Sequence, residues 1–300
     1  MLYILFINGN KSYHISFYLI ENFVILLALF LNLFLKKMRD PLLNIAIQAA
    51  RSAGNIIIRG LDRLDKIQVS EKQPNDYVTD IDQQAEREII SIIRKAHPNH
   101  AILSEECGEM AGTDDYTWII DPLDGTRNFI HGFPHFATSI AISYKGKIER
   151  GVVYDPVRQE LFSASRGKGA QLNDRRIRVS KNKTLEGCLL GTGFPHRNSA
   201  ESVQSYIQSL KAILPLSGDV RRAGAATLDL AYVACGRLDG FWEMGLKPWD
   251  FAAGILFIKE AGGLVCDFNG TEDYMKNGNI VAGNPKILKL LLQQIKPHLA

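Results

Sequence analysis

WIIDPLDGT, residues 118–126, is the stretch of sequence that most constrains the fold. Its first three residues indicate a buried strand, and the proline and glycine that follow predict that the chain leaves this strand sharply. Asp121 and Asp124 therefore come directly after a buried strand and can converge around the Leu123 carbonyl. Three oxygen donors of this kind suit a hard divalent cation such as Mg²⁺. An ordinary polar turn is the alternative, because Asp-Pro and Asp-Gly are both common turn dipeptides.

Further acids stand at the ends of other expected elements. Glu105 follows a short strand, Asp250 lies in the first turn of a helix that Pro248 opens, and Asp82 lies at the start of another helix. Taken singly, each is explained by solvation or helix capping. Taken together, they form a set of carboxylates without the Cys/His cluster of a zinc site or the lysine of a Walker loop. Such a set repels itself unless cations fill it, which predicts metal binding and perturbed proton affinities.

The surrounding pattern predicts two sheets covered by helices. Helical spacing of apolar residues runs from Leu42 to Gly60, and Thr79 with Asp82 resembles a helix-opening cap. Short strands are expected at 101–104, 117–120, 137–144, 148–154 and 160–164. Later strands, at 188–192, 239–243, 264–267 and 279–282, alternate with helices near 199–214, 225–235, 248–261 and 285–299. A boundary near residue 180 divides an N-terminal metal-binding half (38–180) from a C-terminal half that completes the site (181–300).

Composition excludes several classes of protein. The 300 residues carry 35 basic and 32 acidic side chains, for a net charge of +3, so no overall basic field favours direct, sequence-specific nucleic-acid binding. The hydrophobic fraction of 46% is that of a globular chain. The four cysteines are widely spaced and include no CxxC pair, which argues against a zinc ribbon or a secreted disulfide scaffold. A cytoplasmic location fits best.

Residues 1–37 form a hydrophobic N-terminal extension. Its apolar run from Phe17 to Leu35 is borderline for a membrane-spanning helix, and the basic residues that follow argue against a cleaved signal peptide, which would have small residues there. Two interpretations remain, a weak membrane anchor and a start of translation assigned too early. The second is favoured, because Met38 directly precedes Asp40-Pro41, a typical helix opening.

Two long blocks, WIIDPLDGTRNF (118–129) and KPWDFAAG (247–254), resemble the two signatures of the inositol monophosphatase family. Four connecting blocks, at 74–82, 103–109, 191–197 and 221–245, occur in the family's order, and the similarity runs from about Met38 to the C-terminus. The resemblance implies a layered α-β-α-β-α sandwich of the inositol monophosphatase and fructose-1,6-bisphosphatase type. It also implies Mg²⁺-dependent hydrolysis of a phosphate monoester, inhibition by lithium, and a homodimer.

The resemblance assigns metal ligands by position, for two to three Mg²⁺ ions per site. Glu105, Asp121 and the Leu123 carbonyl would hold the first ion. Asp121, Asp124 and Asp250 would hold the second, with Asp121 bridging the two. A third, weaker ion would lie near Glu105, which makes this residue part of the catalytic set as well.

The resemblance also assigns the remaining site residues. Asp82 and Thr126 would position and deprotonate the attacking water, and the backbone N–H groups of Gly125 and Thr126 would meet phosphate oxygens. Glu243 would bind inositol hydroxyl groups. Two further residues would line the same pocket, Arg221 and Ala226. No serine or cysteine with an adjacent base is evident, and we interpret His131 and His135 as residues outside the chemistry, at the surface or behind the site.

Two positions depart from the family pattern. Arg127 stands where many relatives have a second threonine, which places an extra cation near the phosphate site, and Glu71 stands where some relatives have a lysine. The substrate is open between inositol 1-phosphate, fructose 1,6-bisphosphate, a nucleotide phosphate and NADP, and Glu243 favours a polyol. Bacterial members also resemble a component of the ribosomal RNA antitermination machinery that binds NusA. A scaffold role, alone or beside catalysis, is therefore the alternative function.

Overall fold

The structure is a computed structural model that describes residues 3–8, 11–16, 40–73, 76–195 and 200–298. Its contacts divide the chain into two units, Met1–Pro41 and Leu42–Ala300. In the first unit, β1 (Tyr3–Asn8) pairs with β2 (Lys11–Ser16) as an antiparallel hairpin, which was not predicted. The apolar run expected at 17–35 lies outside the described residues. Within the described ranges, no helix has both the length and the apolar character needed to cross a membrane.

The larger unit contains an eight-stranded sheet with the order β12-β11-β10-β9-β8-β7-β5-β6. Neighbouring strands are antiparallel except β5 and β7, which run parallel. The strands are β5 (Ala101–Ser104), β6 (Gly108–Met110), β7 (Tyr116–Asp124), β8 (Ala137–Tyr144), β9 (Lys147–Asp155), β10 (Glu160–Ser165), β11 (Gly169–Leu172) and β12 (Arg175–Arg176).

A five-stranded sheet follows, with the order β14-β13-β15-β17-β16. The strand β13 runs parallel to both of its neighbours, whereas β17 is antiparallel to both of its own. The strands are β13 (Leu189–Thr192), β14 (Asp219–Arg221), β15 (Gly240–Glu243), β16 (Leu264–Cys266) and β17 (Ile280–Gly283).

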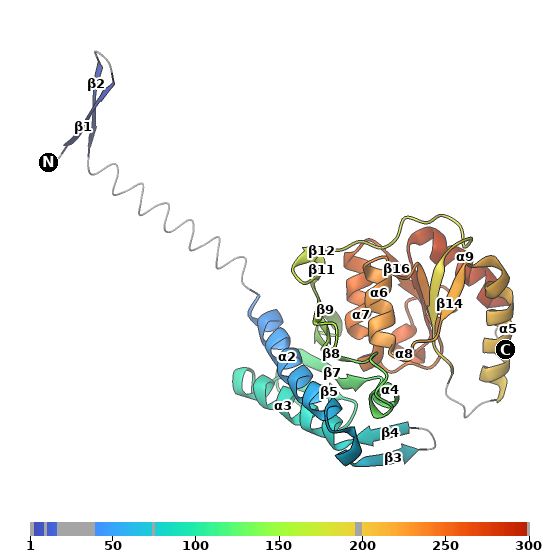
Figure 1. The fold of residues 1–300 in the computed structure, drawn as a ribbon. Helices are drawn as coiled ribbons and strands as arrows, with labels where there is room; N and C mark the ends of the chain where they lie inside the picture. Colours follow the sequence, from blue (N-terminus) through green and yellow to red (C-terminus); the bar gives the residue numbers. More distant parts are fainter. Residues whose placement is uncertain (1–2, 9–10, 17–39, 74–75, 196–199, 299–300) are drawn as a thin grey trace. The chain divides into compact units, whose positions relative to one another are not determined.

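Helices cover the faces of both sheets (Figure 1). One apolar cluster joins α2 (Pro41–Leu61) and α3 (Asp80–Ala96) to the large sheet, a second joins both sheets to α6 (Ala226–Ala234) and α7 (Pro248–Glu260), and a third joins α5 (Ala200–Ile213) and α9 (Pro285–Ile295) to the small sheet. The shorter helices are α4 (Thr126–Ile130), α8 (Tyr274–Asn277) and the 3-10 turns η1 (Leu64–Lys66), η2 (Leu214–Leu216) and η3 (Lys296–His298). The expected α-β-α-β-α layering is confirmed.

Strand β7 shows why the sequence around it is so apolar. Trp118 and Ile120 belong to the cluster under α2 and α3, while Ile119 belongs to the cluster under α6 and α7. A strand with helices on both faces buries every side chain, so an unbroken apolar run replaces the usual alternation.

One expectation about β7 was wrong. The chain does not leave the strand after Ile120, because pairing with β8 continues to Asp124. The register shifts between Asp121, opposite Ser139, and Asp124, opposite Ala137, which marks a bulge. Pro122 lies in this bulge, where the missing N–H costs no ladder hydrogen bond. Elements that were not predicted are β6, β11, β12, β14, the small helices, and a hairpin of β3 (Val69–Gln73) and β4 (Asp76–Thr79).

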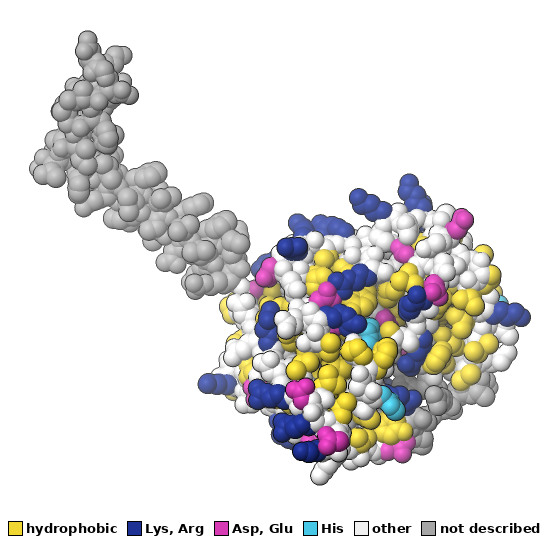
Figure 2. Space-filling view, viewed as in Figure 1, with side chains coloured by type: hydrophobic (Ala, Val, Ile, Leu, Met, Phe, Trp, Pro, Cys, Tyr) yellow, Lys and Arg dark blue, Asp and Glu magenta, His cyan; other side chains and the backbone are white. Residues whose placement is uncertain are grey.

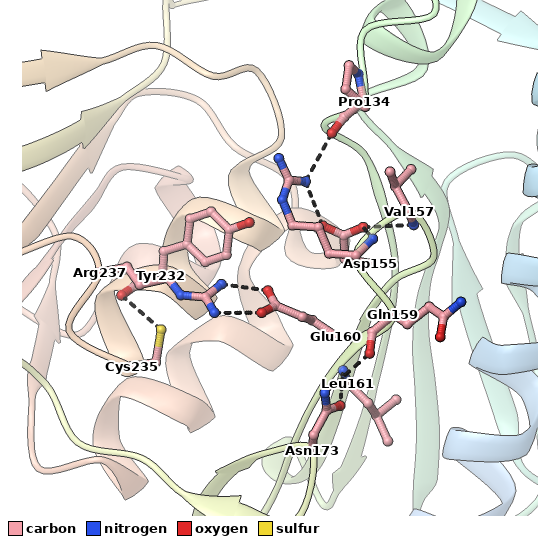
Figure 3. Close-up of polar contacts among 11 residues, drawn as sticks. Pro134, Asp155, Val157, Gln159, Glu160, Leu161, Asn173, Tyr232, Cys235 and Arg237 are labelled. Atoms are coloured by element: carbon pink, nitrogen blue, oxygen red, sulfur yellow. Dashed lines mark hydrogen bonds and ion pairs between the residues drawn. The ribbon is translucent and has the colours of Figure 1, made fainter.

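Polar contacts between the connected ends of β9 and β10 in the large sheet and the end of α6 add to the apolar packing (Figure 3). The guanidinium of Arg237 donates two hydrogen bonds to Glu160 on β10, each 2.5 Å long, and lies 5.0 Å from the centre of the Tyr232 ring. Nearby, Arg158 donates to Asp155 at 2.8 Å and to the Pro134 carbonyl at 3.0 Å. Charged side chains elsewhere are spread in small groups of both signs over the face shown in Figure 2.

Candidate active site and metal centre

The parallel pairing of β5 and β7 brings Glu105 beside Asp121. Ser104 pairs with Ile120 at the carboxyl ends of these strands, so the next residue of each strand lies at the same edge. The Glu105 N–H donates to the Ile120 carbonyl at 3.1 Å, and after burial the negative charge of Glu105 is the largest cause that raises the pKa of Asp121. Two acids far apart in the sequence are therefore neighbours because adjacent strands are less than ~5 Å apart.

The bulge after Asp121 places the next site residues. The Asp121 Oδ1 accepts the Leu123 N–H at 3.0 Å, and the Leu123 carbonyl accepts the Thr126 hydroxyl at 3.0 Å. Gly125 has a φ of 86°, a left-handed conformation that favours glycine, and it starts the short helix α4. Both side chains, Asp121 and Thr126, are therefore held by the backbone of Leu123, which lies between them in the sequence.

Asp124 reaches across to the C-terminal half of the chain. Its Oδ2 accepts the backbone N–H of Thr227 at 2.8 Å and the Thr227 hydroxyl at 2.5 Å. The helix α6, which contains Thr227, has no capping side chain of its own at Ala225. Asp124 thus satisfies an N–H group that would otherwise lack a partner at the start of α6, and the same contact fixes the carboxylate.

Asp250 enters the site from α7. Pro248 occupies the first turn of this helix, and the Asp250 Oδ2 accepts the Lys247 N–H at 2.7 Å. This is the capping role that the sequence indicated. Asp250 is nevertheless close enough to Asp124, Glu105 and Glu243 for their negative charges to raise its pKa.

Asp82 combines a capping role with a place in the site. Its Oδ2 accepts both the backbone N–H and the hydroxyl of Thr79, which completes the predicted capping box at the start of α3. Its Oδ1 accepts the Thr126 hydroxyl at 2.9 Å. The structure therefore brings the predicted pair Asp82 and Thr126 together.

The carboxylates form one electrostatic unit. Burial raises the pKa of Asp121 well above its usual range, and the charges of Glu105, Asp124 and Asp250 raise it further. Burial likewise raises the pKa of Asp124 to about 6 and the pKa of Asp250 well above normal. Asp121 is fully buried, whereas Glu105, Asp124 and Asp250 are half-buried, so the group lies between the interior and solvent; these four acids are called the acidic recess below. The negative charges of these carboxylates repel one another, and a bound cation would reduce this repulsion.

The donor set fits Mg²⁺ by its chemistry, because carboxylate and carbonyl oxygens are the ligands this ion takes. Among the described side chains, no three His, Cys, Asp or Glu residues are grouped closely enough to hold an ion as they stand. The acids are nevertheless close enough for their charges to raise one another's pKa. That they coordinate a metal stays a prediction.

A second acidic group lies beside the metal recess. Glu243 at the end of β15 has a pKa raised by burial and by the charge of Asp229, and the positive charge of Arg222 opposes this rise. Asp229 on α6 is buried, and the charge of Asp124 raises its pKa further. A Cβ on Gly193 would lie 1.8 Å from the Glu243 Oε1, so the glycine provides the space that this carboxylate occupies.

The two neighbouring arginines, Arg221 and Arg222, make different contacts. Arg221 is exposed at the end of β14 and forms an ion pair with Asp219. Arg222 is the arginine whose charge acts on Glu243, and its guanidinium lies 4.8 Å from the centre of the Phe194 ring. Ala226, buried at the first position of α6, lies next to Thr227.

The remaining candidates lie outside the acidic recess. Arg127 packs over the Tyr77 ring, with 5.4 Å between its guanidinium carbon and the ring centre. His131 is exposed, and together with these two residues it lines a separate surface pocket. His135 is buried, and burial lowers its pKa to about 4. Glu71 is exposed on β3.

Comparisons with known proteins agree with this geometry. The sequence profile of the inositol monophosphatase family matches residues 38–300. The chain belongs to the inositol monophosphatase family. It is 57% identical over 264 residues to "Nus factor SuhB" of Pseudomonas aeruginosa, a match that covers 87% of this chain and 97% of that protein.

Solved structures of the family have the same fold. The extragenic suppressor protein SuhB of Bartonella henselae superposes with a TM-score of 0.84 at 46% identity, covering 86% of this chain and 99% of the other. The inositol monophosphatase of Anabaena (Nostoc) sp. PCC 7120 superposes with a TM-score of 0.76 at 37% identity, covering 85% and 95%.

Four residues that shape the site were missed from the sequence. Thr227 and Arg222 stand beside residues that the resemblance already assigned, and only the tertiary contacts distinguish them. Asp229 and Glu86 are acids inside apolar helical stripes, where Asp229 is 2% exposed and Glu86 is 6% exposed. A charge at a core position of a helix is the signal that could have identified both.

Proposed function

We propose that this protein is a Mg²⁺-dependent phosphate monoester hydrolase that converts inositol 1-phosphate to inositol and inorganic phosphate. The observation that carries the proposal is the cluster of four acids from three separate elements, β5 with the turn after it, β7 and α7, in which burial and the neighbouring charges raise the pKa of Asp121, Asp124 and Asp250. Membership of the inositol monophosphatase family supports the reaction class.

Glu105, Asp121, Asp124, Asp250 and the Leu123 carbonyl would hold the metal ions. When bound, Mg²⁺ lowers the pKa of a water molecule and neutralises negative charge on the phosphate, which would otherwise repel an anionic nucleophile. Each aspartate of this set already accepts a backbone hydrogen bond through one oxygen. This fixes the carboxylates before any ligand enters, so little reorganisation is required on binding.

Thr126 and Asp82 are suited to orient the attacking water. The single proton of the Thr126 hydroxyl has two acceptors within reach, the Asp82 Oδ1 and the Leu123 carbonyl, and donation to Asp82 leaves the oxygen lone pairs able to accept a proton from water. Asp82 is itself held through its other oxygen by Thr79 and cannot turn away. Proton transfer can therefore pass from water to the Thr126 oxygen and from the Thr126 hydroxyl to Asp82.

A polyol is the leaving group that the neighbouring pocket favours. Glu243 is held in the space beside Gly193, where its carboxyl oxygens can bind vicinal hydroxyl groups of an inositol ring. The negative charges of Asp229 and Asp124 act on Glu243 and raise its pKa. They would also repel a second anionic group of a substrate at this position. Inositol 1-phosphate is thus preferred over the bisphosphate and nucleotide alternatives.

Phosphate release tests the proposal directly. We expect release from inositol 1-phosphate with Mg²⁺, none in excess chelator, inhibition by Li⁺, and weaker release from fructose 1,6-bisphosphate, adenosine bisphosphate and NADP. Asp121→Asn should abolish the activity. Full activity in the presence of chelator would exclude the metal mechanism.

A role as a transcription antitermination factor is the second candidate. The 57% identity to a protein named Nus factor SuhB favours it, and the partner would be NusA in a transcription complex. Such a role would use an outer surface and would not require hydrolysis. If Asp121→Asn loses phosphatase activity but still binds NusA and supports antitermination, the biological role is the scaffold. Loss of both would favour catalysis.

A further inference from the structure

Glu86 on α3 is a buried carboxylate that the proposed reaction does not use. It lies one helical turn after Asp82, with 6% of its surface exposed, in the same stripe as Ile89 and Ile93. A carboxylate in such a position requires compensating hydrogen bonds, because burying an unpaired charge is costly. Its partners identify what it does.

All the donors to Glu86 come from one turn. Its Oε1 accepts the Ser104 hydroxyl, the Glu106 N–H at 3.1 Å and the Cys107 N–H at 3.1 Å. Ser104 is the last residue of β5 and directly precedes Glu105, and the other two donors directly follow Glu105. The three donors therefore flank Glu105 on both sides, and a single carboxylate oxygen fixes the backbone before and after it.

We propose that Glu86 is a positioning residue that aims the Glu105 carboxylate at Asp121 and thereby sets the affinity of the site for its first divalent cation. The inference rests on the proposed function, since Glu105 acts there as a metal ligand. Residues that orient a ligand through hydrogen bonds commonly change metal affinity by 10–100-fold when they are replaced.

Helix α3 connects this role to the water side of the site. Asp82 and Glu86 are four residues apart, so they lie on one face of the helix. Asp82 accepts the Thr126 hydroxyl, and Glu86 accepts the donors around Glu105. One rigid element thus fixes the distance between the water-orienting pair and the first metal ligand.

The test separates hydrogen-bond geometry from charge. Mn²⁺ alone is titrated into the full chain, and its dissociation constant is measured by calorimetry or electron paramagnetic resonance without substrate. Glu86→Gln keeps an acceptor oxygen at the same reach and should bind Mn²⁺ within about threefold of wild type. Glu86→Asp keeps the charge but is one methylene shorter, so it should bind at least roughly tenfold more weakly.

Glu88 provides a matched control on the same helix. It accepts the Ser52 hydroxyl at 2.6 Å, as Glu86 accepts that of Ser104, but Ser52 lies on α2 and not in the turn around Glu105. Glu88→Asp should therefore leave the Mn²⁺ affinity unchanged. Circular dichroism and urea unfolding of each variant show whether a loss of affinity reflects a loss of fold.

Three outcomes would overturn the inference. Wild-type affinity in Glu86→Asp would show that the turn needs no positioning, and weak binding in Glu86→Gln with normal binding in Glu86→Asp would show that charge alone matters. Absence of Mn²⁺ binding by the wild-type chain would remove the metal site and the proposed function with it. The first two results leave the proposed phosphatase intact.

Discussion

Single residues in this site have two roles at once. Asp82, Asp124 and Asp250 each accept a backbone N–H near the start of a helix, and each also faces the acidic recess. Capping was the simpler explanation for Asp82 and Asp250 in the sequence, and it is correct for both. Capping does not prevent a role in the site, because the capping hydrogen bond uses one carboxyl oxygen, leaves the other available and holds the group in a fixed position.

At the level of residues, a motif in the sequence can indicate which side chains come together, but it cannot indicate contacts that only the tertiary structure decides. The motif at 118–129 identified Asp121, Asp124 and Thr126, which the structure brings into one recess with Glu105 and Asp250. Arg221 and Arg222 are adjacent and chemically identical, so nothing in the sequence could indicate that it is the charge of Arg222 that acts on the pKa of Glu243.

Gly193 provides a test at the level of one residue. Gly193→Ala would place a methyl group 1.8 Å from the Glu243 Oε1, so the carboxylate must move. We expect the KM for inositol 1-phosphate to rise roughly tenfold or more, as for a lost charged hydrogen bond, with little change for p-nitrophenyl phosphate.

The control for Gly193→Ala is the double variant with Glu243→Ala. Because both changes act on the same contact, the double variant should have the KM of Glu243→Ala alone. Additive effects of the two substitutions would show that Gly193 acts elsewhere.

At the level of elements, the site depends on where strands and helices end. Parallel pairing of β5 with β7 places Glu105 beside Asp121, and the bulge in β7 turns Asp124 toward α6. The boundaries of most long elements could be predicted from apolar spacing and caps. The hairpin β3–β4 and the strand β14 could not, because short strands of mixed polarity carry little periodic signal.

Helix capping at α3 gives a test at this level. Thr79→Ala removes the capping hydroxyl and should lower the free energy of unfolding by about 1 kcal/mol. It should also reduce kcat, because Asp82 loses one of the donors that hold it toward Thr126. Urea unfolding and phosphate-release kinetics measure the two effects.

Asn284 is the matched control, since it caps α9 through its side chain and lies in the small-sheet half of the chain. Asn284→Ala should destabilise the protein by a similar or larger amount, because it also loses hydrogen bonds to residues 180 and 182. Its kcat should stay close to wild type. An equal fall in kcat for both variants would mean that reduced stability alone explains the loss.

At the level of the whole molecule, the layered fold explains how acids from two halves of the chain come close together. The large sheet supplies Glu105, Asp121 and Asp124, while α7 supplies Asp250 and β15 supplies Glu243. The sequence predicted these layers correctly, because each element carries an apolar face or stripe that only a neighbouring layer can cover.

We expect that the N-terminal extension, residues 1–37, is not needed for the folding or the activity of the rest of the chain. The family match covers residues 38–300, and the layered unit comprises Leu42–Ala300. A protein that begins at Met38 should therefore keep the melting temperature and the phosphate-release rate of the full chain. Differential scanning calorimetry and kinetics of the two forms check this, and a large loss of either would show that the extension contributes to the folded body.

The acidic recess makes a prediction about pH and stability. Asp82 and Asp124 both have folded-state pKa values of about 6, above the 3.8 of a free carboxyl. The folded state therefore keeps protons that the unfolded state has lost, so the stability they contribute is present below about pH 4 and is lost as pH rises through 6. Divalent metal should restore the stability lost in this window, because it replaces the protons.

Thermal unfolding of the full chain with chelator and with saturating Mg²⁺, from pH 4 to pH 7.5, therefore tests the central claim most directly. We expect the melting temperature in chelator to fall relative to that in Mg²⁺ as pH rises, and Asp121→Asn to remove most of the difference. Identical melting temperatures with chelator and with Mg²⁺ across this range would contradict a metal-dependent cluster of carboxylates.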